Sequence, residues 1–464
     1  MKSSKRALII AAEFPPFKTI GRIRSAKICK HLLNLGWEPI VLTVGENTSG
    51  PYDDATLREV PPGTLVYRAF CPEPQEQVIR FLKKFIGSRT NAVASASDES
   101  LSDTPTPASS NLRQSAIKAL LSEMKSAFDT FVRKNLLIPD DWLLWIPPAV
   151  LKGKEICAKH EINVIFSTAP PFSDLLVGYF LKRITGLPWV TDYRDLWTGD
   201  VLRDWVPQWR RRLEINIERW AVSKADAVVA VSEPKTASLR ERVFHLPARR
   251  FFTITNGYDP EEYDGLSKPP ETSTAIRFVY TGRLFKNRRG YELIEALGKL
   301  HQERPELRGS FRVEYWGGVS SEIMARLREL IRKYSLEDHI HFFDDVPYAQ
   351  AKQKQVSADV LLLIVDTGET TDGVIPGKLF EYVAAKRPIL CIAAPGATPD
   401  IIERGRLGWV TPPGDIQALR EVLEHILSGS YLTSFAPDAP YLEQFERKRQ
   451  IELLAQIFNG VVTA

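Results

Sequence analysis

The chain has 464 residues, which at roughly 100 to 200 residues per domain predicts two or three domains, and 44% apolar side chains are enough to form a core in each. Its 61 Lys and Arg residues against 57 Asp and Glu residues give a net charge of +4, which is too balanced for a dedicated nucleic-acid-binding protein. No apolar run approaches the roughly 18 residues of a membrane-spanning helix, which excludes an integral membrane protein.

The N-terminal residues and the cysteines indicate the compartment. The apolar run Ala7–Ala12 ends at Glu13 and is too short for a signal peptide, so we interpret it as a buried strand. The cysteines show no CxxC spacing, which favours neither a disulfide framework nor a zinc site. We expect a cytoplasmic protein without a metal or other cofactor, and peripheral association with the inner face of the membrane is the alternative. The four cysteines are Cys29, Cys71, Cys157 and Cys391.

The first half of the chain alternates short apolar runs with helical patterns. A strand at Ala7–Ala12, a helix ending near Gly36 and a strand at Pro39–Val44 predict a βαβ unit and hence a parallel sheet. The alternation continues and predicts an N-terminal Rossmann-like lobe over residues 1–255. Its further strands are expected at Leu65–Ala69, Val164–Ser167, Trp189–Asp192, Ala227–Val231 and Phe252–Ile254.

An insertion interrupts this lobe at about residues 73–140. Its centre, Ser88–Asn111, is rich in Ser, Thr, Ala, Asp and Pro and almost lacks large apolar residues, which predicts disorder. Helical periodicity on both sides, at Val78–Ile86 and Ile117–Val132, predicts a helical insertion with a disordered tip.

The alternation restarts after a linker at residues 256–275, which is rich in Pro, Gly and acidic residues. Residues 276–440 predict a second Rossmann-like lobe, and residues 441–464 predict a C-terminal helix that could cross back to the first lobe. The predicted fold is therefore α/β, with two doubly wound parallel-sheet lobes that face each other across a cleft, where open α/β sheets bind ligands. The second lobe's strands are expected at Ile276–Tyr280, Phe311–Tyr315, Ile340–Phe343, Val360–Val365, Pro388–Ile392 and Trp409–Val410, and its helices at Tyr291–Leu300, Ser321–Tyr334, Pro347–Ser357, Gly377–Ala385 and Ile416–Leu427.

The segment Gly373–Leu390 carries the strongest local signal. A helix is expected to open at Pro376 and Gly377, which places Lys378 and Glu381 on one face of its first turn. Free amides at a helix N-terminus suit a phosphate, Lys378 adds a positive charge, and a carboxylate can accept two hydrogen bonds from ribose hydroxyls. An ordinary amphipathic helix with a solvated lysine is equally compatible with this spacing.

A second signal is the basic loop that follows the first strand of the second lobe. It contains Arg283, Lys286, Arg288 and Arg289 and opens a helix. Arginine binds a diphosphate in bidentate fashion, and positive charge would stabilise a departing nucleotide diphosphate. A solvated basic surface loop is the alternative.

Together these segments resemble the family 4 glycosyltransferases of the GT-B fold, and specifically those that build bacterial surface polysaccharides. Gly282, Arg283 and the pair Arg289–Gly290 match the family's Gly-Arg and basic-Gly pattern. The resemblance implies that Arg283, Arg289 and Lys378 bind the donor diphosphate and that Glu381 binds the donor ribose. The family's first glutamate is replaced here by Gly373, and Asp372, one residue out of register, is a candidate substitute.

The resemblance also implies a wider set of site residues. Gly377 would contact the donor phosphates. The loops after the second and third strands of the second lobe would line the nucleotide base. Gly21, Asp192 and Arg194 would handle the acceptor or its phosphate in the first lobe. For several of these residues a structural role is open as well: a turn for Gly21, an ion-pair network for Asp192 and Arg194, and a core position for Trp316. The base-lining candidates are Trp316, Gly317 and Val346.

The segment Pro207–Val222 predicts an amphipathic helix. Trp209, Leu213, Ile217 and Trp220 form an apolar stripe, and arginines lie elsewhere. Docking on anionic lipid is one interpretation. We expect the stripe to pack on the first lobe, because most amphipathic helices face a core.

The resemblance predicts an enzyme that moves a sugar from a nucleotide-diphosphate-sugar donor to a glycan or lipid-linked acceptor, with retention of configuration. Cations at Arg283, Arg289 and Lys378 would lower the leaving-group barrier, and the donor phosphate would take the acceptor proton. Two alternatives stay open: a nucleotide-sugar epimerase of the same fold, and a degenerate, non-catalytic nucleotide-sugar-binding protein, which the missing glutamate at Gly373 favours. No metal and no nucleic acid are expected.

Overall fold

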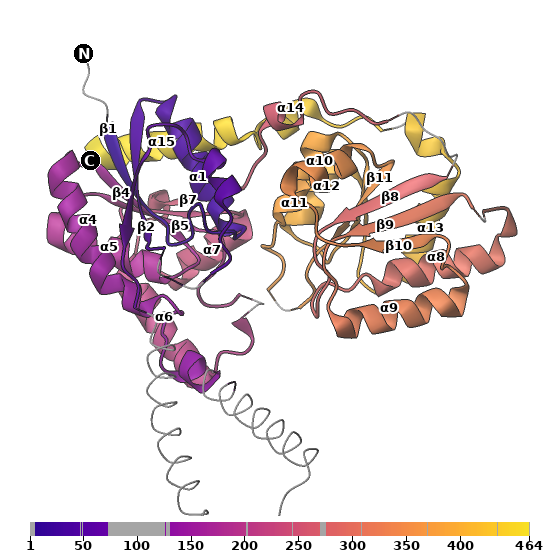
Figure 1. Ribbon diagram of the computed structural model, residues 1–464, viewed down its shortest axis with the longest axis horizontal. Helices are drawn as coiled ribbons and strands as arrows, with labels where there is room; N and C mark the ends of the chain where they lie inside the picture. The colour runs from indigo at the N-terminus through magenta and orange to yellow at the C-terminus, as the bar shows by residue number, and fades with distance from the viewer. Residues whose placement is uncertain are drawn as a thin grey trace, which may run out of the picture. The chain divides into compact units, whose positions relative to one another are not determined.

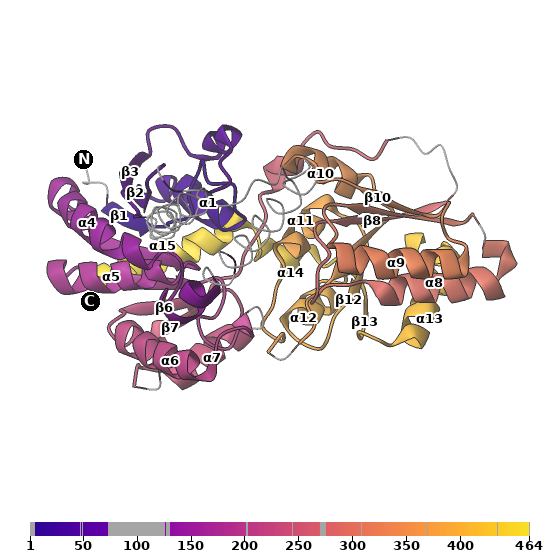
Figure 2. The same cartoon turned by 60° about the horizontal axis from the view of Figure 1, so that its bottom comes forward.

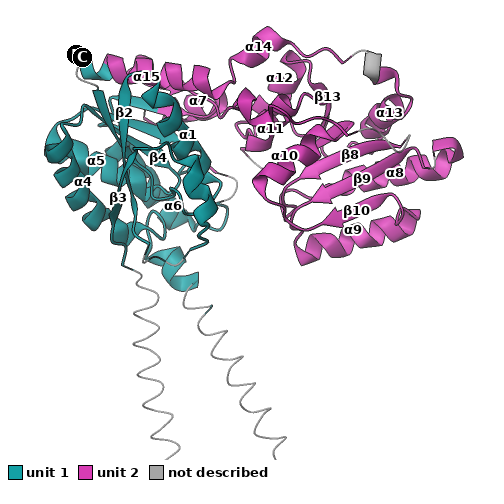
Figure 3. Cartoon of the chain, turned by 45° about the horizontal axis from the view of Figure 1, so that its top comes forward, with its two compact units in different colours: residues 1–198, 203–228, 461–464 teal, residues 199–202, 229–460 magenta. Residues whose placement is uncertain are grey.

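The computed structural model describes residues 5–463 apart from residues 47, 49, 73–125, 127–129, 201–202, 244, 270–274, 308, 369 and 434. The expected disordered tip Ser88–Asn111 and most of its helical flanks lie outside the described residues. The chain divides into two compact units, coloured separately in Figure 3. Unit 1 comprises residues 1–198, 203–228 and 461–464, and unit 2 comprises residues 199–202 and 229–460.

The first sheet has seven strands in the order β3-β2-β1-β4-β5-β6-β7. All six residues of β4 are buried, because helices cover both faces of the sheet (Figures 1 and 2), as in other parallel sheets. The order reverses between β1 and β4, so loops that follow these strands diverge to opposite faces and leave room for ligands. The strands are β1 (Lys5–Ile10), β2 (Trp37–Val44), β3 (Leu65–Ala69), β4 (Val164–Ala169), β5 (Trp189–Tyr193), β6 (Ala227–Ala230) and β7 (Phe251–Thr253), and the helices are α1 (Gly21–Leu33), α4 (Ile146–His160), α5 (Ser173–Thr185), α6 (Gln208–Val222) and α7 (Glu233–Arg242).

The second sheet has six parallel strands in the order β10-β9-β8-β11-β12-β13, with its reversal between β8 and β11. One core lies on each face of this sheet, and the strands are buried between them. The strands are β8 (Ile276–Thr281), β9 (Phe311–Trp316), β10 (Ile340–Phe343), β11 (Val360–Ile364), β12 (Ile389–Ile392) and β13 (Gly408–Thr411), and the helices are α8 (Tyr291–Glu303), α9 (Ser321–Tyr334), α10 (Tyr348–Val356), α11 (Gly377–Ala385), α12 (Ala397–Arg404) and α13 (Ile416–Leu427).

The two parallel sheets with flanking helices confirm the predicted α/β class. The sequence did not indicate α12, a short helix that begins directly after Gly396. The predicted C-terminal helix is two helices, α14 (Ala439–Glu443) and α15 (Arg447–Thr463). Residues 461–464 group with unit 1, whereas the rest of α15 groups with unit 2.

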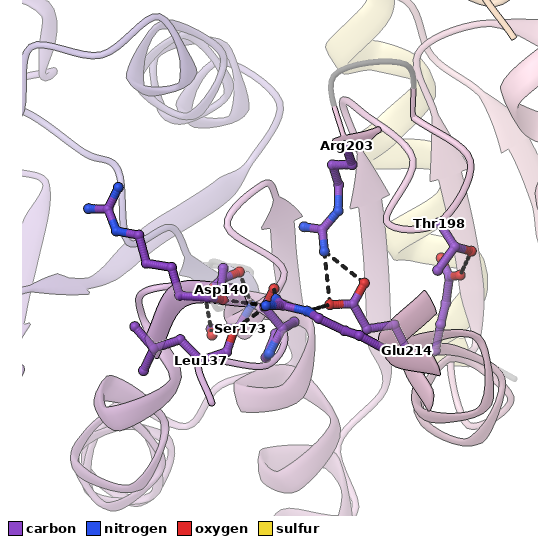
Figure 4. Close-up of polar contacts among 10 residues, drawn as sticks. Leu137, Asp140, Ser173, Thr198, Arg203 and Glu214 are labelled. Atoms are coloured by element: carbon purple, nitrogen blue, oxygen red, sulfur yellow. Dashed lines mark hydrogen bonds and ion pairs between the residues drawn. The ribbon is translucent and has the colours of Figure 1, made fainter. Parts of the chain in front are cut away.

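The expected packing of the α6 stripe on the first lobe is only partly right, since Ile217 is partly buried and the ring of Trp220 lies 4.1 Å from that of Tyr179 in α5. Its buried face carries Arg210, Glu214 and Glu218 together with two small apolar residues. Trp209 and Trp220 instead keep 50% and 49% of their surface exposed, and Leu213 keeps 42%. Most of the apolar stripe therefore lies outside the buried face, which a buried ionic network occupies (Figure 4).

Candidate functional site

Two glycines end neighbouring strands of the second sheet in the same unusual conformation. Gly282 follows β8 and Gly317 follows β9, and each has φ +138. The amide of Gly282 donates to the carbonyl of Trp316 over 2.7 Å. A β-carbon on Gly317 would lie under 3.0 Å from the carbonyl oxygen of Gly282, so only glycine fits at the carboxyl ends of these strands.

Lys378 reaches from the first turn of α11 to the end of β8. A β-carbon on Gly282 would lie under 3.0 Å from both Cε and Nζ of this lysine. The ammonium group also lies over the ring of Tyr280, 5.4 Å from its centroid. The glycine after β8 therefore provides the space in which the lysine lies.

Arg288 provides a second cation beside Lys378. It pairs with Asp366, which follows β11, over 2.6 Å, and its side chain is only 13% exposed. Burial, and secondarily the charge of Arg288, lower the pKa of Lys378 to about 8. The charges of Glu381 and Asp366 partly offset this lowering of the pKa, because a nearby carboxylate favours the charged lysine.

Glu381 lies one turn after Lys378 and is held by an amide. Gln355 of α10 donates to its carboxylate over 2.8 Å, and also to the hydroxyl of Thr281 over 3.0 Å. Tyr263 in turn donates to the Gln355 side-chain oxygen over 2.9 Å. Burial raises the pKa of the Glu381 carboxyl, and Gln355 and Lys378 act in the opposite direction.

The N-terminus of α11 has no side-chain cap. Pro376 precedes the helix in an extended conformation and accepts no amide through its side chain, and no acidic residue lies in the first turn. Gly377 is exposed, and apart from its chain neighbours and the backbone of its own helix nothing described lies within 4 Å of the position that a β-carbon there would occupy. Amides at this helix end are thus accessible to an anion beside the Lys378 ammonium group.

The structure does not bring Arg283 and Arg289 into this cluster. Arg283 is 74% exposed and pairs with Asp345 over 3.1 Å. Arg289 is exposed, and its guanidinium group lies over the ring of Tyr291. Arg288, in the same loop, pairs with Asp366, one of the carboxylates that act on Lys378.

The other donor candidates lie around the ends of β9, β10 and α11. Trp316 is partly buried, stacks on Phe343 at 4.0 Å and donates to Glu314 over 2.9 Å, which is a structural role. Val346 follows β10 and is partly buried. Asp372 is exposed, and its carbonyl accepts the amide of Ala397 over 2.7 Å.

Gly373 is buried and closely surrounded. Its carbonyl accepts a hydrogen bond from the Ser232 hydroxyl over 2.7 Å. A β-carbon there would lie 3.0 Å from Cγ of Lys235 and 3.3 Å from the Ser232 oxygen. A side chain at this position would require these neighbours to shift by a few tenths of an ångström.

A second polar cluster lies in unit 1 at the carboxyl ends of β1, β4 and β5. A β-carbon on Gly21, the first residue of α1, would lie under 3.0 Å from the carboxylate of Glu13 and from the guanidinium of Arg194. These two side chains pair over 3.8 Å. A larger residue at position 21 would therefore displace the ends of these two side chains, although the backbone of Gly21 is not in the left-handed region.

Buried carboxyl groups surround this pair. Asp174 accepts the amide of Ala12 over 3.0 Å through one oxygen, and its other oxygen has no hydrogen-bond partner among the described residues. Asp140 accepts from the amide and the hydroxyl of Ser173 over 3.0 and 2.6 Å. Burial raises the pKa of the carboxyl groups of Asp140 and Asp174, and that of Glu13 as well.

Asp192 lies apart from that cluster in the core of unit 1. It is fully buried and accepts from Arg24 over 2.7 and 3.0 Å and from Thr168 over 2.6 Å. These contacts satisfy the carboxylate, as expected if Asp192 belongs to a structural ion-pair network. Arg194 instead lies beside Glu13 and Gly21.

Comparisons with known proteins identify the family of this chain. Residues 275–429 match the model of "Glycosyl transferases group 1", and residues 115–262 match that of "Glycosyltransferase Family 4". The chain belongs to the family 4 glycosyltransferases. The first match contains the Lys378–Glu381 cluster, and the second contains Arg194 and α6.

Curated relatives of this glycosyltransferase come from bacterial polysaccharide biosynthesis. "Probable glycosyltransferase WbjE" of Pseudomonas aeruginosa is 24% identical over 57% of this chain and 66% of its own length. The amylovoran biosynthesis glycosyltransferase AmsK of Erwinia amylovora is 28% identical over 39% of this chain and 43% of its own length. The aligned segments thus span less than two thirds of these relatives.

Solved structures share the fold over nearly the whole chain. The structure of HepE from Anabaena in complex with UDP and glucose covers 98% of this chain and 100% of its own, with a TM-score of 0.61 and 14% identity. This likeness confirms the GT-B arrangement of two Rossmann-like sheets.

Sequence reasoning missed some residues of the candidate site and placed others correctly on one helix. Gln355 and Tyr263 gave no signal, because polar residues in helices and linkers are ordinary. Lys378 and Glu381 could be paired in advance because helical spacing fixes their shared face.

Among the described residues, no group of three or more His, Cys, Asp or Glu side chains could hold a metal ion, and metal independence stays a prediction.

Proposed function

We propose that this protein transfers a sugar from a nucleotide-diphosphate-sugar donor to a glycan or lipid-linked acceptor in polysaccharide biosynthesis, with retention of configuration. The observation that carries the proposal is the juxtaposition of Lys378 and Arg288 at the uncapped N-terminus of α11, one turn before Glu381. Glycosyltransferase relatives and a UDP-bound structural neighbour support the same donor class.

The donor diphosphate would bind at the N-terminus of α11. Its charge would be met by Lys378, Arg288 and the first amides of the helix. Burial of the two cations strengthens this interaction, since charges screened from water attract more strongly. Lys378 in the protonated form would also donate a hydrogen bond to a phosphate oxygen.

The donor ribose would bind beside the diphosphate. Among the described residues, Gln355 donates a side-chain hydrogen bond to Glu381, and a carboxylate has capacity for more. Two vicinal hydroxyls of the ribose would supply the remaining hydrogen bonds to this carboxylate. Gln355, held by Tyr263 and Thr281, would keep the carboxylate oriented.

The reaction would break the bond between the anomeric carbon and the diphosphate oxygen. Negative charge grows on the diphosphate as this bond breaks, so preorganised cations lower the barrier without a metal. One such group contributes about 100- to 1000-fold in rate in other enzymes. The acceptor hydroxyl would attack on the same face, and its proton would pass to the departing phosphate.

The acceptor would bind in unit 1 at the cluster of Glu13, Gly21 and Arg194. The pair lies at the carboxyl ends of β1 and β5, next to the reversal of strand order, where open sheets bind ligands. Arg194 suits an anionic or hydroxyl-rich group, and Glu13 suits a sugar hydroxyl.

The test is a transfer assay with candidate nucleotide sugars and membrane-derived lipid-linked saccharides, with the anomeric configuration of the product read by NMR. We expect a glycoside and an equimolar nucleoside diphosphate. Conversion of the donor to an isomeric nucleotide sugar without an acceptor would instead identify an epimerase. Binding of donors without any product would identify a non-catalytic protein.

Glu381→Gln separates the two parts of the donor site. We expect it to weaken binding of nucleoside diphosphates at least about tenfold, which is about 1.4 kcal/mol, while binding of inorganic pyrophosphate stays within about twofold. Equal loss for both ligands would mean that Glu381 supports the cations rather than the ribose. Glu295→Gln, a substitution in α8 on an i,i+4 surface pair, is the control.

A further inference from the structure

Helix α6 presents the reverse of the usual amphipathic arrangement. Both acidic side chains of α6, Glu214 and Glu218, lie on its buried face together with Arg210. Trp209, Leu213 and Trp220 project within about 40° of one another around the helix axis, at 3.6 residues per turn. All three are at least 42% exposed.

A buried network fixes this orientation. Arg210 is fully buried and donates to Glu214 over 2.7 Å and to the carbonyls of Leu137 and Pro139 over 2.8 and 2.9 Å. Arg203 binds the same Glu214 over 2.7 and 2.9 Å, as Figure 4 shows. Because removing these bonds would leave buried charges unpaired, the helix cannot readily rotate to bury its tryptophans.

The apolar surface continues onto α5. The ring of Trp220 lies 4.1 Å from that of Tyr179 and 6.4 Å from that of Phe180, which is itself 37% exposed. Ile184, one turn further along α5, is 51% exposed. We call this set of five exposed residues the aromatic patch: Phe180, Ile184, Trp209, Leu213 and Trp220.

The exposed charges on these two helices are positive. On α6 they are Arg211, Arg212 and Arg219, because Glu214 and Glu218 are buried. On α5, Arg183 is exposed beside Ile184, and the acidic Asp174 is buried. Arginines next to exposed tryptophans match the chemistry of an anionic lipid surface, whose phosphates attract cations and whose interface accepts indole rings.

We propose that the aromatic patch is a docking surface for an anionic membrane, on which α5 and α6 of unit 1 rest without crossing the bilayer. None of the described helices is long and apolar enough to cross a membrane. An amphipathic helix with aromatic residues beside arginines binds in the plane of the interface instead. The proposal deepens the proposed function, on which it rests for the lipid-linked acceptor that such docking would serve.

The test is flotation of the full chain with vesicles of phosphatidylcholine containing phosphatidylglycerol, or of phosphatidylcholine alone, without any nucleotide. We expect flotation with the anionic vesicles, and a loss of it at high salt, since screening weakens surface charges. Trp209→Ala alone, and with Trp220→Ala, should lower the floated fraction at least tenfold. Arg212→Gln with Arg219→Gln should lower it on anionic vesicles only.

Matched variants and a second readout keep the result interpretable. Leu151→Ala and Phe70→Ala, at positions 71% and 58% exposed elsewhere in unit 1, should float like the unaltered chain. Titration with nucleoside diphosphates should give unchanged affinity for the patch variants. Thus failure to float with intact nucleotide binding would overturn this proposal alone, whereas absent nucleotide binding would contradict the proposed function alone.

Two other outcomes would also overturn the proposal. If the unaltered chain floats but the tryptophan variants float equally well, another surface binds lipid. If Trp209→Ala converts a dimer to a monomer on a sizing column and no variant floats, the aromatic patch is an interface between two copies of the chain.

Discussion

Lys378 passes so close to the backbone of Gly282 that a β-carbon on the glycine would lie under 3.0 Å from both Cε and Nζ of the lysine. The two residues are nearly a hundred positions apart and belong to β8's end and to α11. Their contact places an ammonium group at the carboxyl edge of the second sheet, next to a helix N-terminus. The proposed binding of the donor diphosphate depends on this position of the ammonium group.

Gly282→Ala should displace Lys378 and weaken binding of nucleoside diphosphates at least about tenfold, or about 1.4 kcal/mol, measured by calorimetric titration. The substitution also introduces backbone strain of about 1 to 3 kcal/mol, because φ +138 suits glycine alone. Gly265→Ala is the control, since its φ is +77 and nothing lies within 4 Å of the new methyl group. If both variants lower stability but bind equally well, the contact has no role in binding.

The affinity for nucleoside diphosphates should fall as the pH rises through about 8, because the pKa of Lys378 is lowered to about 8 and only the protonated amine attracts the phosphates. Lys378→Arg should remove this dependence, since arginine stays charged. The effect on folding has the opposite sign: between about pH 8 and the lysine's ordinary value of 10.5, the unfolded chain binds more protons, so this residue's contribution to stability rises with pH. A flat affinity profile for the unaltered chain would contradict the assignment.

Substitution of Arg288 should weaken nucleoside diphosphate binding more than substitution of Arg289, although both residues are arginines and are adjacent in the chain. Arg288→Met should weaken nucleoside diphosphate binding at least about tenfold, because it removes the cation beside Lys378. Arg289→Met should change it less than about twofold, because that side chain is exposed over Tyr291. Thermal unfolding of both variants controls for loss of the Asp366 pair. A larger effect of Arg289→Met would restore the assignment made from the sequence pattern.

The buried network of α6 should contribute strongly to stability. Arg210→Met should lower the free energy of unfolding by about 3 kcal/mol or more, because Glu214 and three backbone carbonyls lose a buried donor. Arg211→Met, at the exposed neighbouring position, should change it by less than about 0.5 kcal/mol. Urea unfolding of the two variants provides the comparison, and equal midpoints would contradict the network's role.

The strands could be predicted from the sequence because buried parallel strands are short, continuous apolar runs. Leu65–Ala69 and Ile340–Phe343 have the predicted bounds, and most others differ by one or two residues. The helix α12 escaped prediction because it is only eight residues long and contains a proline near its start. Periodicity needs more residues than that to stand out.

The orientation of α6 could not be predicted, because an apolar stripe shows which residues share one face of a helix but not which face is buried. Besides Glu214 on the same helix, the partners of Arg210 are backbone carbonyls distant in sequence, at Arg133, Leu137 and Pro139. A similar reason applies to Arg288: a bridge between Phe285 and Arg288 turns the loop, so that adjacent arginines take different directions. Charge pattern within a loop does not specify these directions.

The most direct test of the central claim is calorimetric titration of Lys378→Met with a panel of nucleoside diphosphates at pH 7, beside Lys386→Met, which alters an exposed lysine just beyond the same helix. The account predicts that one nucleoside diphosphate binds the unaltered chain and Lys386→Met alike, and binds Lys378→Met at least about tenfold more weakly. Equal affinity of Lys378→Met and Lys386→Met for that nucleotide would contradict it.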